Sequence, residues 1–191
     1  MGVGWCVAAP LVACAITVSA QTKKPAIPSG PTMAETKAWL ETQAPPLAKA
    51  FESQLDQRTL MLNSTTHDAI EFSLESCRLQ FVNVDTFRLK APNTDKTRVS
   101  SWRNLIPLKE LDVGGVKVEQ EQIMADRPVD FVKIPVRATS RDSIDQVATD
   151  DPKVVRSGAA TIYVRNAADG ERIVAAVRRA AVLCGAPISP F

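Results

Sequence analysis

The sequence predicts an α+β fold: a mostly antiparallel sheet or roll of about five to seven strands with an N-terminal helix and a C-terminal amphipathic helix. Apolar residues recur at helical spacing near both ends of the chain. Between about residues 58 and 164 they alternate with polar residues, as in half-buried strands. Adjacent glycines at 114 and 115 suit a tight hairpin turn between two such strands.

Residues 1–20 have the composition of an export signal. They carry no charged side chain, run largely apolar, and end in the small residues Val18 and Ala20. This pattern predicts a signal peptide cleaved after Ala20. Signal peptides usually begin with Lys or Arg, but no basic residue precedes this apolar segment. Either the signal is atypical or the true start codon lies upstream. Leu11-Val12-Ala13-Cys14 also resembles a lipobox, so lipidation of Cys14 is the alternative. If uncleaved, the segment is long enough to span a bilayer.

The rest of the chain divides into a linker, one domain and a tail. Residues 21–31 contain three prolines and predict a stiff extended linker. Residues 32–186 are expected to form a single globular α+β domain, because a chain of this length sustains one hydrophobic core. Residues 187–191 form the tail.

The domain is expected to open with a helix. Thr32 and Glu35 form a capping box, in which each side chain binds the free backbone N–H of the other. Pro45 and Pro46 then stop or kink the helix. Leu47, Phe51 and Leu55 recur at intervals of four, which predicts one or two further helical turns.

The alternating segments are predicted to be strands and the polar stretches between them loops. Cys77 is placed on the apolar side of its strand. The loops are expected at residues 93–97 and 139–157. The strand candidates are residues 70–74, 77–81, 87–89, 102–108, 116–123, 129–138 and 160–164.

The last helix has the clearest signals. Asn166 or Asp169 is expected to cap it, and Gly185 supplies a residue that tolerates the left-handed conformation at its end. Its apolar residues share one face: Ile173, Val177, Ala180, Ala181 and Cys184.

Removal of residues 1–20 leaves two cysteines, Cys77 and Cys184. In an oxidising compartment a disulfide between them is the default, and it would join the last helix to the sheet. Two buried free thiols are the alternative. A catalytic thiol is disfavoured, because the only histidine, His67, lies in a polar stretch and a thiolate nucleophile needs a base beside it.

Charge and composition disfavour several function classes. The 23 basic and 21 acidic residues give a net charge of +2 without a block of like charge, so nucleic acid is not an expected partner. The aspartates at 142, 145, 150 and 151 lack the glycine and terminal glutamate of a calcium loop, and we expect neither a metal nor another cofactor. No Gly-x-Ser-x-Gly motif is present, and we assign no catalytic residue.

Three arginines of the last helix, Arg172, Arg178 and Arg179, form a candidate patch for an anionic partner. The partner would be a lipid headgroup or an envelope polymer. The alternative is a solvated helix face.

Four short motifs carry a resemblance: Trp39-Leu40, Ser76-Cys77-Arg78-Leu79, residues 107–112 (Pro-Leu-Lys-Glu-Leu-Asp) and Leu183-Cys184-Gly185. Together they resemble a group of uncharacterised exported bacterial proteins with an N-terminal helix, a run of strands and a C-terminal helix ending in Leu-Cys-Gly. The order of elements is also similar to the pleckstrin-homology-like fold. The resemblance implies a fold and an exported location, and it implies no activity or ligand.

The sequence therefore predicts an exported protein of the cell envelope, periplasmic or secreted, that acts as a non-enzymatic binding or structural module. Its partner would be an envelope protein or polymer. Contact with the membrane is expected only if the N-terminal segment is retained or Cys14 is lipidated. The alternative is a secreted hydrolase that uses carboxylates.

Overall fold

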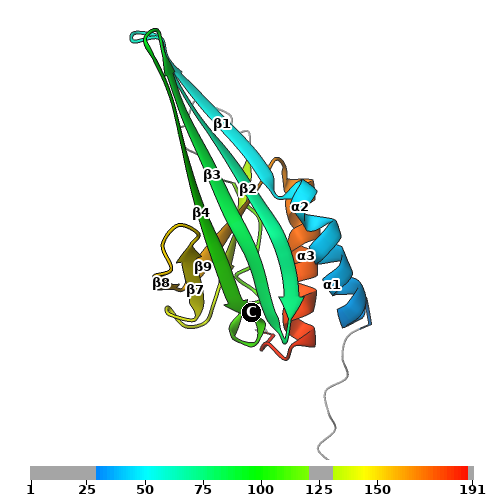
Figure 1. Cartoon of the computed structure of the whole chain (residues 1–191). Helices are drawn as coiled ribbons and strands as arrows, with labels where there is room; N and C mark the ends of the chain where they lie inside the picture. Colours follow the sequence, from blue (N-terminus) through cyan, green and yellow to red (C-terminus); the bar gives the residue numbers. More distant parts are fainter. Residues whose placement is uncertain (1–28, 121–130, 189–191) are drawn as a thin grey trace, which may run out of the picture.

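The computed structural model describes residues 29–120 and 131–188. It confirms the α+β fold class, with a six-stranded and a three-stranded antiparallel sheet and a helix near each end of the described chain (Figure 1). The helices are α1 (Met33–Thr42), α2 (Ala44–Leu47) and α3 (Ala167–Leu183). The strands are β1 (Lys49–Asp56), β2 (Met61–Glu75), β3 (Arg78–Ala91), β4 (Thr94–Pro107), β5 (Glu119–Gln120), β6 (Val132–Arg137), β7 (Ile144–Ala148), β8 (Val154–Ser157) and β9 (Ala159–Val164).

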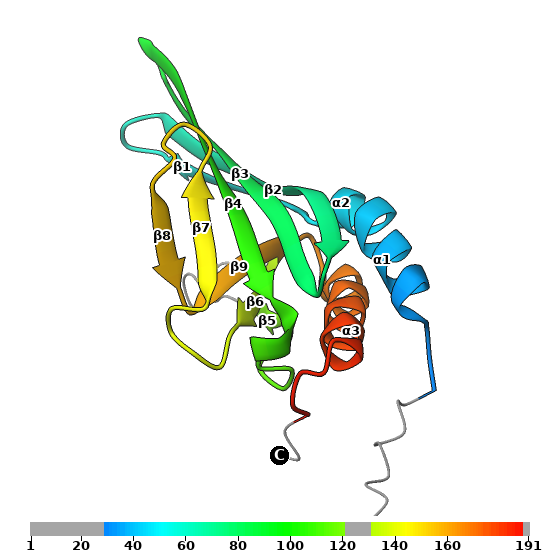
Figure 2. The ribbon, with the colours of Figure 1, turned by 60° about the horizontal axis from the view of Figure 1, so that its bottom comes forward.

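The larger sheet has the strand order β1-β2-β3-β4-β7-β8. Its first four strands form a meander of long hairpins whose distal ends extend away from the helices (Figures 1 and 2). The register between β2 and β3 shifts between Ile70 and Ser73. Because of this bulge, Ala69 and Phe72 both lie in the core although they are three positions apart.

The smaller sheet has the strand order β5-β6-β9. In the view of Figure 1 it lies behind the first four strands of the larger sheet. Polar side chains from the larger sheet bind carbonyl groups of β9. Asn83 Nδ2 donates to the Thr161 carbonyl at 2.9 Å, and Gln146 Nε2 donates to the Ala159 carbonyl at 3.4 Å. Strand β9 is at the edge of its sheet, so these amides add donors from the larger sheet, and the Ala159 carbonyl also accepts the Ser157 hydroxyl at 2.9 Å.

The helix ends follow the predicted signals. The Thr32–Glu35 capping box is present at the start of α1, and Asn166 Oδ1 accepts the Asp169 N–H at 2.9 Å at the start of α3. Gly185, with φ of +86°, follows α3 in the left-handed conformation. Helix α1 lies beside the part of β2 that β1 does not cover, where Glu41 accepts the Leu74 N–H at 3.1 Å.

One cluster of buried side chains connects the helices and both sheets. It includes Leu40 of α1, Phe81 of β3, Ile134 of β6, Ile162 of β9 and Ile173 of α3, all without exposed surface. The predicted apolar face of α3 is buried as well. Burial of this apolar surface is the main favourable term in folding.

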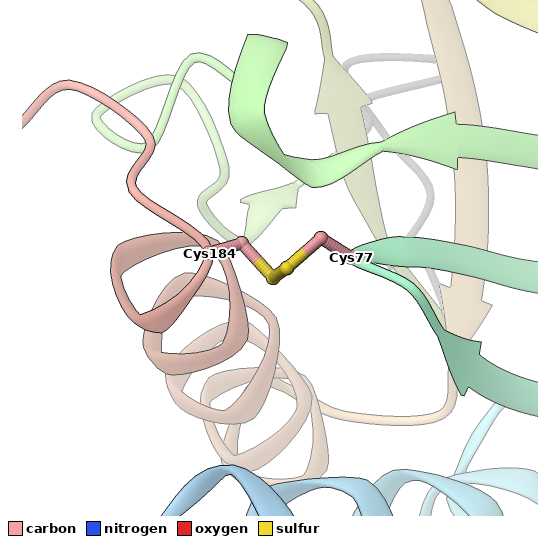
Figure 3. The surroundings of a disulfide bond; sticks show 2 residues. All are labelled: Cys77 and Cys184. Atoms are coloured by element: carbon pink, nitrogen blue, oxygen red, sulfur yellow. A yellow bond between two sulfur atoms is a disulfide. The ribbon is translucent and has the colours of Figure 1, made fainter.

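A disulfide joins Cys77 to Cys184, with their Cα atoms 5.5 Å apart (Figure 3). Cys184 is the last residue of the buried face of α3, as predicted. Cys77 is not in a strand, which corrects its predicted placement. Ser76 and Cys77, with φ of 48° and 58°, form the two-residue turn between β2 and β3. Such turns usually contain Asn and Gly, so the Ser-Cys pair gave no turn signal.

The predicted helical turns at residues 47–55 are wrong beyond Leu47, because residues 49–56 form β1. Spacing by four is compatible with both a helix and the outer face of a strand. In the strand, Phe51 and Leu55 point outward and are exposed, whereas Ala50 points into the core. Pairing with β2 decides the conformation.

Both predicted loops contain strand. Only residues 92 and 93 separate β3 from β4, and β7 and β8 lie within residues 139–157. Strands β7 and β8 were missed because the alternation fails there. The inward residue Gln146 is polar, and it lies inward because it binds β9 and Asn104.

Gly114 and Gly115 do not form a hairpin turn with positive φ. The Gly115 N–H donates to the backbone and side-chain oxygens of Asp112, at 3.1 and 3.0 Å. A Cβ at Gly115 would lie 2.3 Å from Asp112 Oδ2, so the glycine permits this close approach.

Several predictions fall wholly or partly outside the described residues. These are the signal peptide with Ala20 and Cys14, most of the linker, residues 121–123 and 129–130 of two strand candidates, and the end of the tail. Within residues 29–120 and 131–188, no helix combines the length and the apolar character needed to cross a bilayer.

Candidate binding groove

The geometry of α3 divides the three predicted arginines. Residues seven positions apart lie within about 20° of each other around a helix, and residues six apart about 120°. Arg172 and Arg179 accordingly line one groove with α1. Arg178 lies on another side of α3, where it donates to the Gly114 carbonyl at 3.4 Å. Its buried Nε has no partner among the described residues.

The groove between α1 and α3 has a volume of about 790 Å³. Its apolar part consists of the Trp39 indole, the Pro31 ring and two alanine side chains of α3. We call it the α1–α3 groove, and its lining residues are Ser29, Gly30, Pro31, Glu35, Thr36, Trp39, Arg172, Ala175, Ala176 and Arg179.

The capping box of α1 fixes the acidic side chain of the groove. Glu35 Oε2 accepts the backbone N–H of Thr32 at 2.7 Å and its hydroxyl at 2.8 Å. The backbone hydrogen bond from Thr32, and then the hydroxyl bond, lower the pKa of Glu35 below its ordinary value. The carboxylate therefore stays ionised and bound to the start of the helix.

The two arginines occupy different parts of the groove. Arg179 Nε donates to the Pro31 carbonyl at 2.7 Å, which holds residues 29–31 against α3. Arg172 is exposed, and its guanidinium carbon lies 5.8 Å from the centre of the Trp39 ring. No ion pair joins Arg172 to a carboxylate of the described residues within 4.0 Å.

A groove of this composition can hold an anionic group beside an apolar one. A guanidinium presents parallel N–H donors that match a carboxylate or a phosphate. The Trp39 ring restricts the Arg172 side chain through a cation–π contact and offers a flat apolar surface to a ligand. Among the side chains that line the groove, no hydroxyl is hydrogen-bonded to a histidine or a carboxylate.

A second polar cluster, which the sequence analysis missed, surrounds His67. Its Nδ1 lies 2.7 Å from Asp85 Oδ1 of β3, and its Nε2 lies 3.7 Å from Glu52 Oε1 of β1. The Tyr163 ring of β9 stacks on the imidazole with a centroid distance of 4.2 Å. Phe131 contacts both rings. His67 therefore lies in a contact between the two sheets and not in a polar turn.

The environment of His67 favours its protonated form. Burial of the imidazole opposes the charge, but the hydrogen bond and the charge of Asp85, together with Glu52, raise the pKa of His67 above its ordinary value of 6.5. Only the strand register could have revealed this cluster, because Asp85 is 18 residues from His67 and pairs with it across β2 and β3.

Two of the four aspartates considered as metal ligands have partners of their own. Asp145 lies in β7 and pairs with Arg156 at 3.7 Å, and Asp151 accepts the Lys153 N–H at 3.1 Å. Within the described part of the chain, no group of three His, Cys, Asp or Glu side chains is placed to hold a metal ion.

Comparison with protein-family models, with curated proteins and with solved structures finds no match to this chain.

Proposed function

We propose that this protein is an exported module of the cell envelope that binds an anionic envelope protein or polymer in the α1–α3 groove. One observation carries the proposal: Arg172 and Arg179 line the same groove as the exposed surface of Trp39. The groove thus combines positive charge with an apolar wall.

The energetic argument concerns Arg172. A hydrogen bond to a charged group contributes about 1.5–3 kcal/mol, roughly twice the value of a neutral one. Arg172 is oriented by Trp39 and is not neutralised by a described carboxylate, so a ligand carboxylate or phosphate gains this interaction without displacing an internal partner. Arg179 adds positive charge to the same groove.

The exported location rests on the signal-like residues 1–20 and on the Cys77–Cys184 disulfide. Disulfides persist mainly in oxidising compartments such as the periplasm and the extracellular space. Both features support the same compartment through independent chemistry.

Two labelled probes test the groove by fluorescence anisotropy: a peptide of alternating Glu and Leu, and oligogalacturonate as an anionic polymer. We expect one of them to bind, and Arg172→Gln to weaken that binding about tenfold or more. Arg165→Gln, which removes an equal charge just before α3 and outside the groove, should leave binding unchanged.

Equal weakening by both substitutions would show that only overall charge matters and would contradict the proposal. The proposal would also be contradicted if neither probe binds and neither probe changes the fluorescence spectrum of Trp39. Trp39→Phe provides the reference for that spectrum.

The alternative function, a hydrolase that uses carboxylates, is favoured by one observation: Glu52 and Asp85 converge on His67 from two sides. Its test is turnover of a panel of glycoside and ester substrates. Turnover that disappears in Glu52→Gln while the protein remains folded would support the hydrolase over the binding module.

A further inference from the structure

Exposed apolar side chains gather at the end of the molecule that lies away from the helices. We call the ends of the β1–β2 and β3–β4 hairpins, residues 55–62 and 86–99, the distal end (Figures 1 and 2). Of the ten large apolar side chains that are exposed in the described residues, five lie here. They are Leu55, Leu60, Leu62, Phe87 and Val99.

The distal end also concentrates positive charge. It contains five basic and two acidic residues, a formal charge of +3, whereas the whole chain carries only +2. Arg88 is neutralised by a two-point ion pair with Asp95, in which its Nε donates at 2.9 Å. Lys90, Lys96 and Arg98 of the same hairpin are exposed and form no ion pair with a described residue.

The backbone at Leu60 is unusual for an apolar residue. Leu60 has φ of +54°, a conformation that Gly or Asn adopts at lower cost, and its side chain is 63% exposed. The turn therefore holds a leucine outward in a conformation that disfavours leucine. Strained backbone conformations of this kind cluster at functional sites.

We propose that the distal end docks onto the surface of an anionic phospholipid bilayer. Lysines and arginines near such a surface are attracted to the lipid phosphates, and each one increases binding about fivefold. Leu60 lies at the turn, and Leu62 and Phe87 lie on opposite faces of the hairpins, so the distal end would enter the boundary between headgroups and acyl chains end-on, with both faces in contact with lipid. An anionic polysaccharide offers charge but no apolar phase for these side chains, so the combination favours a bilayer. The site is distinct from the α1–α3 groove.

Cosedimentation of the purified protein with lipid vesicles tests the proposal. We expect tighter binding to vesicles of phosphatidylglycerol and phosphatidylcholine than to phosphatidylcholine alone. The variant Lys90→Gln/Lys96→Gln/Arg98→Gln should lower the partition coefficient about 100-fold. The matched control Lys109→Gln/Arg141→Gln/Arg165→Gln removes the same charge elsewhere and should bind like the original protein.

A second variant tests the apolar contribution without endangering the fold. Leu60→Asn places at this position a residue that tolerates positive φ, so its stability should be kept while vesicle binding falls about tenfold. All variants keep the apolar N-terminal residues of the original protein. A difference in vesicle binding between the distal-end variants and the control therefore comes from the distal end.

Equal partition of the two triple variants would overturn the proposal, and so would binding without preference for the anionic vesicles. If oligogalacturonate competes fully with vesicles and Leu60→Asn binds normally, the surface recognises charge alone and bilayer docking is wrong. Arg172→Gln should not affect vesicle binding, which separates this surface from the groove.

Discussion

Two side-chain amides, those of Asn83 and Gln146, link the two sheets, and a third, that of Asn104, binds Gln146 within the larger sheet. Asn104 is fully buried, accepts Gln146 Nε2 at 3.0 Å, and directs its own Nδ2 toward the Trp102 carbonyl at 3.3 Å. Asn83 and Gln146 bind carbonyls of β9. A buried polar group without a partner costs about 1–3 kcal/mol, so the three amides and the β9 carbonyls depend on one another.

His67 makes stability depend on pH in a definite direction. Its pKa is raised in the folded protein, so its favourable contribution is complete below the ordinary value near 6.5 and is lost as the pH rises through the folded-state value. The urea concentration at the midpoint of unfolding should therefore decrease as the pH rises above about 6.5.

The variant His67→Gln should lose most of this pH dependence. His67 is the only histidine of the chain, so no other histidine titrates in the same range. An unchanged slope in the variant would show that the dependence has another origin. Asp85→Asn provides a second check, because it removes the partner at 2.7 Å and should reduce the slope while leaving the imidazole in place.

At the scale of residues, the sequence predicted caps and the cysteine pair but not the polar interior. Thr32, Glu35, Asn166 and Gly185 act within a few positions of themselves, so local rules suffice for them. Asn104 and His67 are defined by partners on other strands. Their polarity indicated exposure, and the partners that make burial tolerable become visible only with the strand register.

Helix α3 depends on local and long-range interactions at opposite ends. Asn166 caps its first turn, and the disulfide joins its C-cap residue, Cys184, to the turn between β2 and β3 (Figure 3). The buried face between these points contributes the apolar contacts. The helix is therefore fixed at both ends and along one side.

The double variant Cys77→Ser/Cys184→Ser should lower the free energy of unfolding by about 4–5 kcal/mol, because the disulfide closes a loop over a sequence separation of 107. Urea unfolding followed by circular dichroism measures the loss. The original protein under reducing conditions should unfold at the same urea concentration as the variant. Equal stability of the oxidised and reduced forms would contradict the prediction.

Elements were predictable where one face is apolar and the other polar. Helices α1 and α3 and the inner halves of β2 and β3 meet this condition. Strand β1 presents Phe51 and Leu55 to solvent, and β7 presents Gln146 to the interior, so each reverses the usual pattern. Both strands are established by pairing with neighbours that a linear pattern does not contain.

At the scale of the whole molecule, the two sheets and the helices share one cluster of buried side chains. We therefore expect a single cooperative unfolding transition. Hydrogen exchange measured by mass spectrometry in low urea should give peptides from β3, β6 and α3 the same free energy of opening. Independent opening of the β5-β6-β9 sheet would contradict this expectation.

The candidate groove was partly predictable. Arg172 and Arg179 were identified from their charge and their position on an amphipathic helix, and the helical repeat already separates Arg178 from them. The sequence singled out Trp39 only as part of the Trp39-Leu40 motif, without a role in binding. Its position beside Arg172 depends on how α1 packs against α3, which is a property of the folded chain.

The position of the disulfide divides the chain into a covalent ring and an open arm. The ring runs from Cys77 to Cys184 and contains β3, β4, the smaller sheet and α3, whereas α1, β1 and β2 lie outside it. The two hairpins of the distal end therefore differ in topology. A protease that cuts at residues 92–93 leaves all residues in one covalent molecule, but a cut at residues 57–60 severs α1 and β1 from the rest. The groove would then be held together by packing alone.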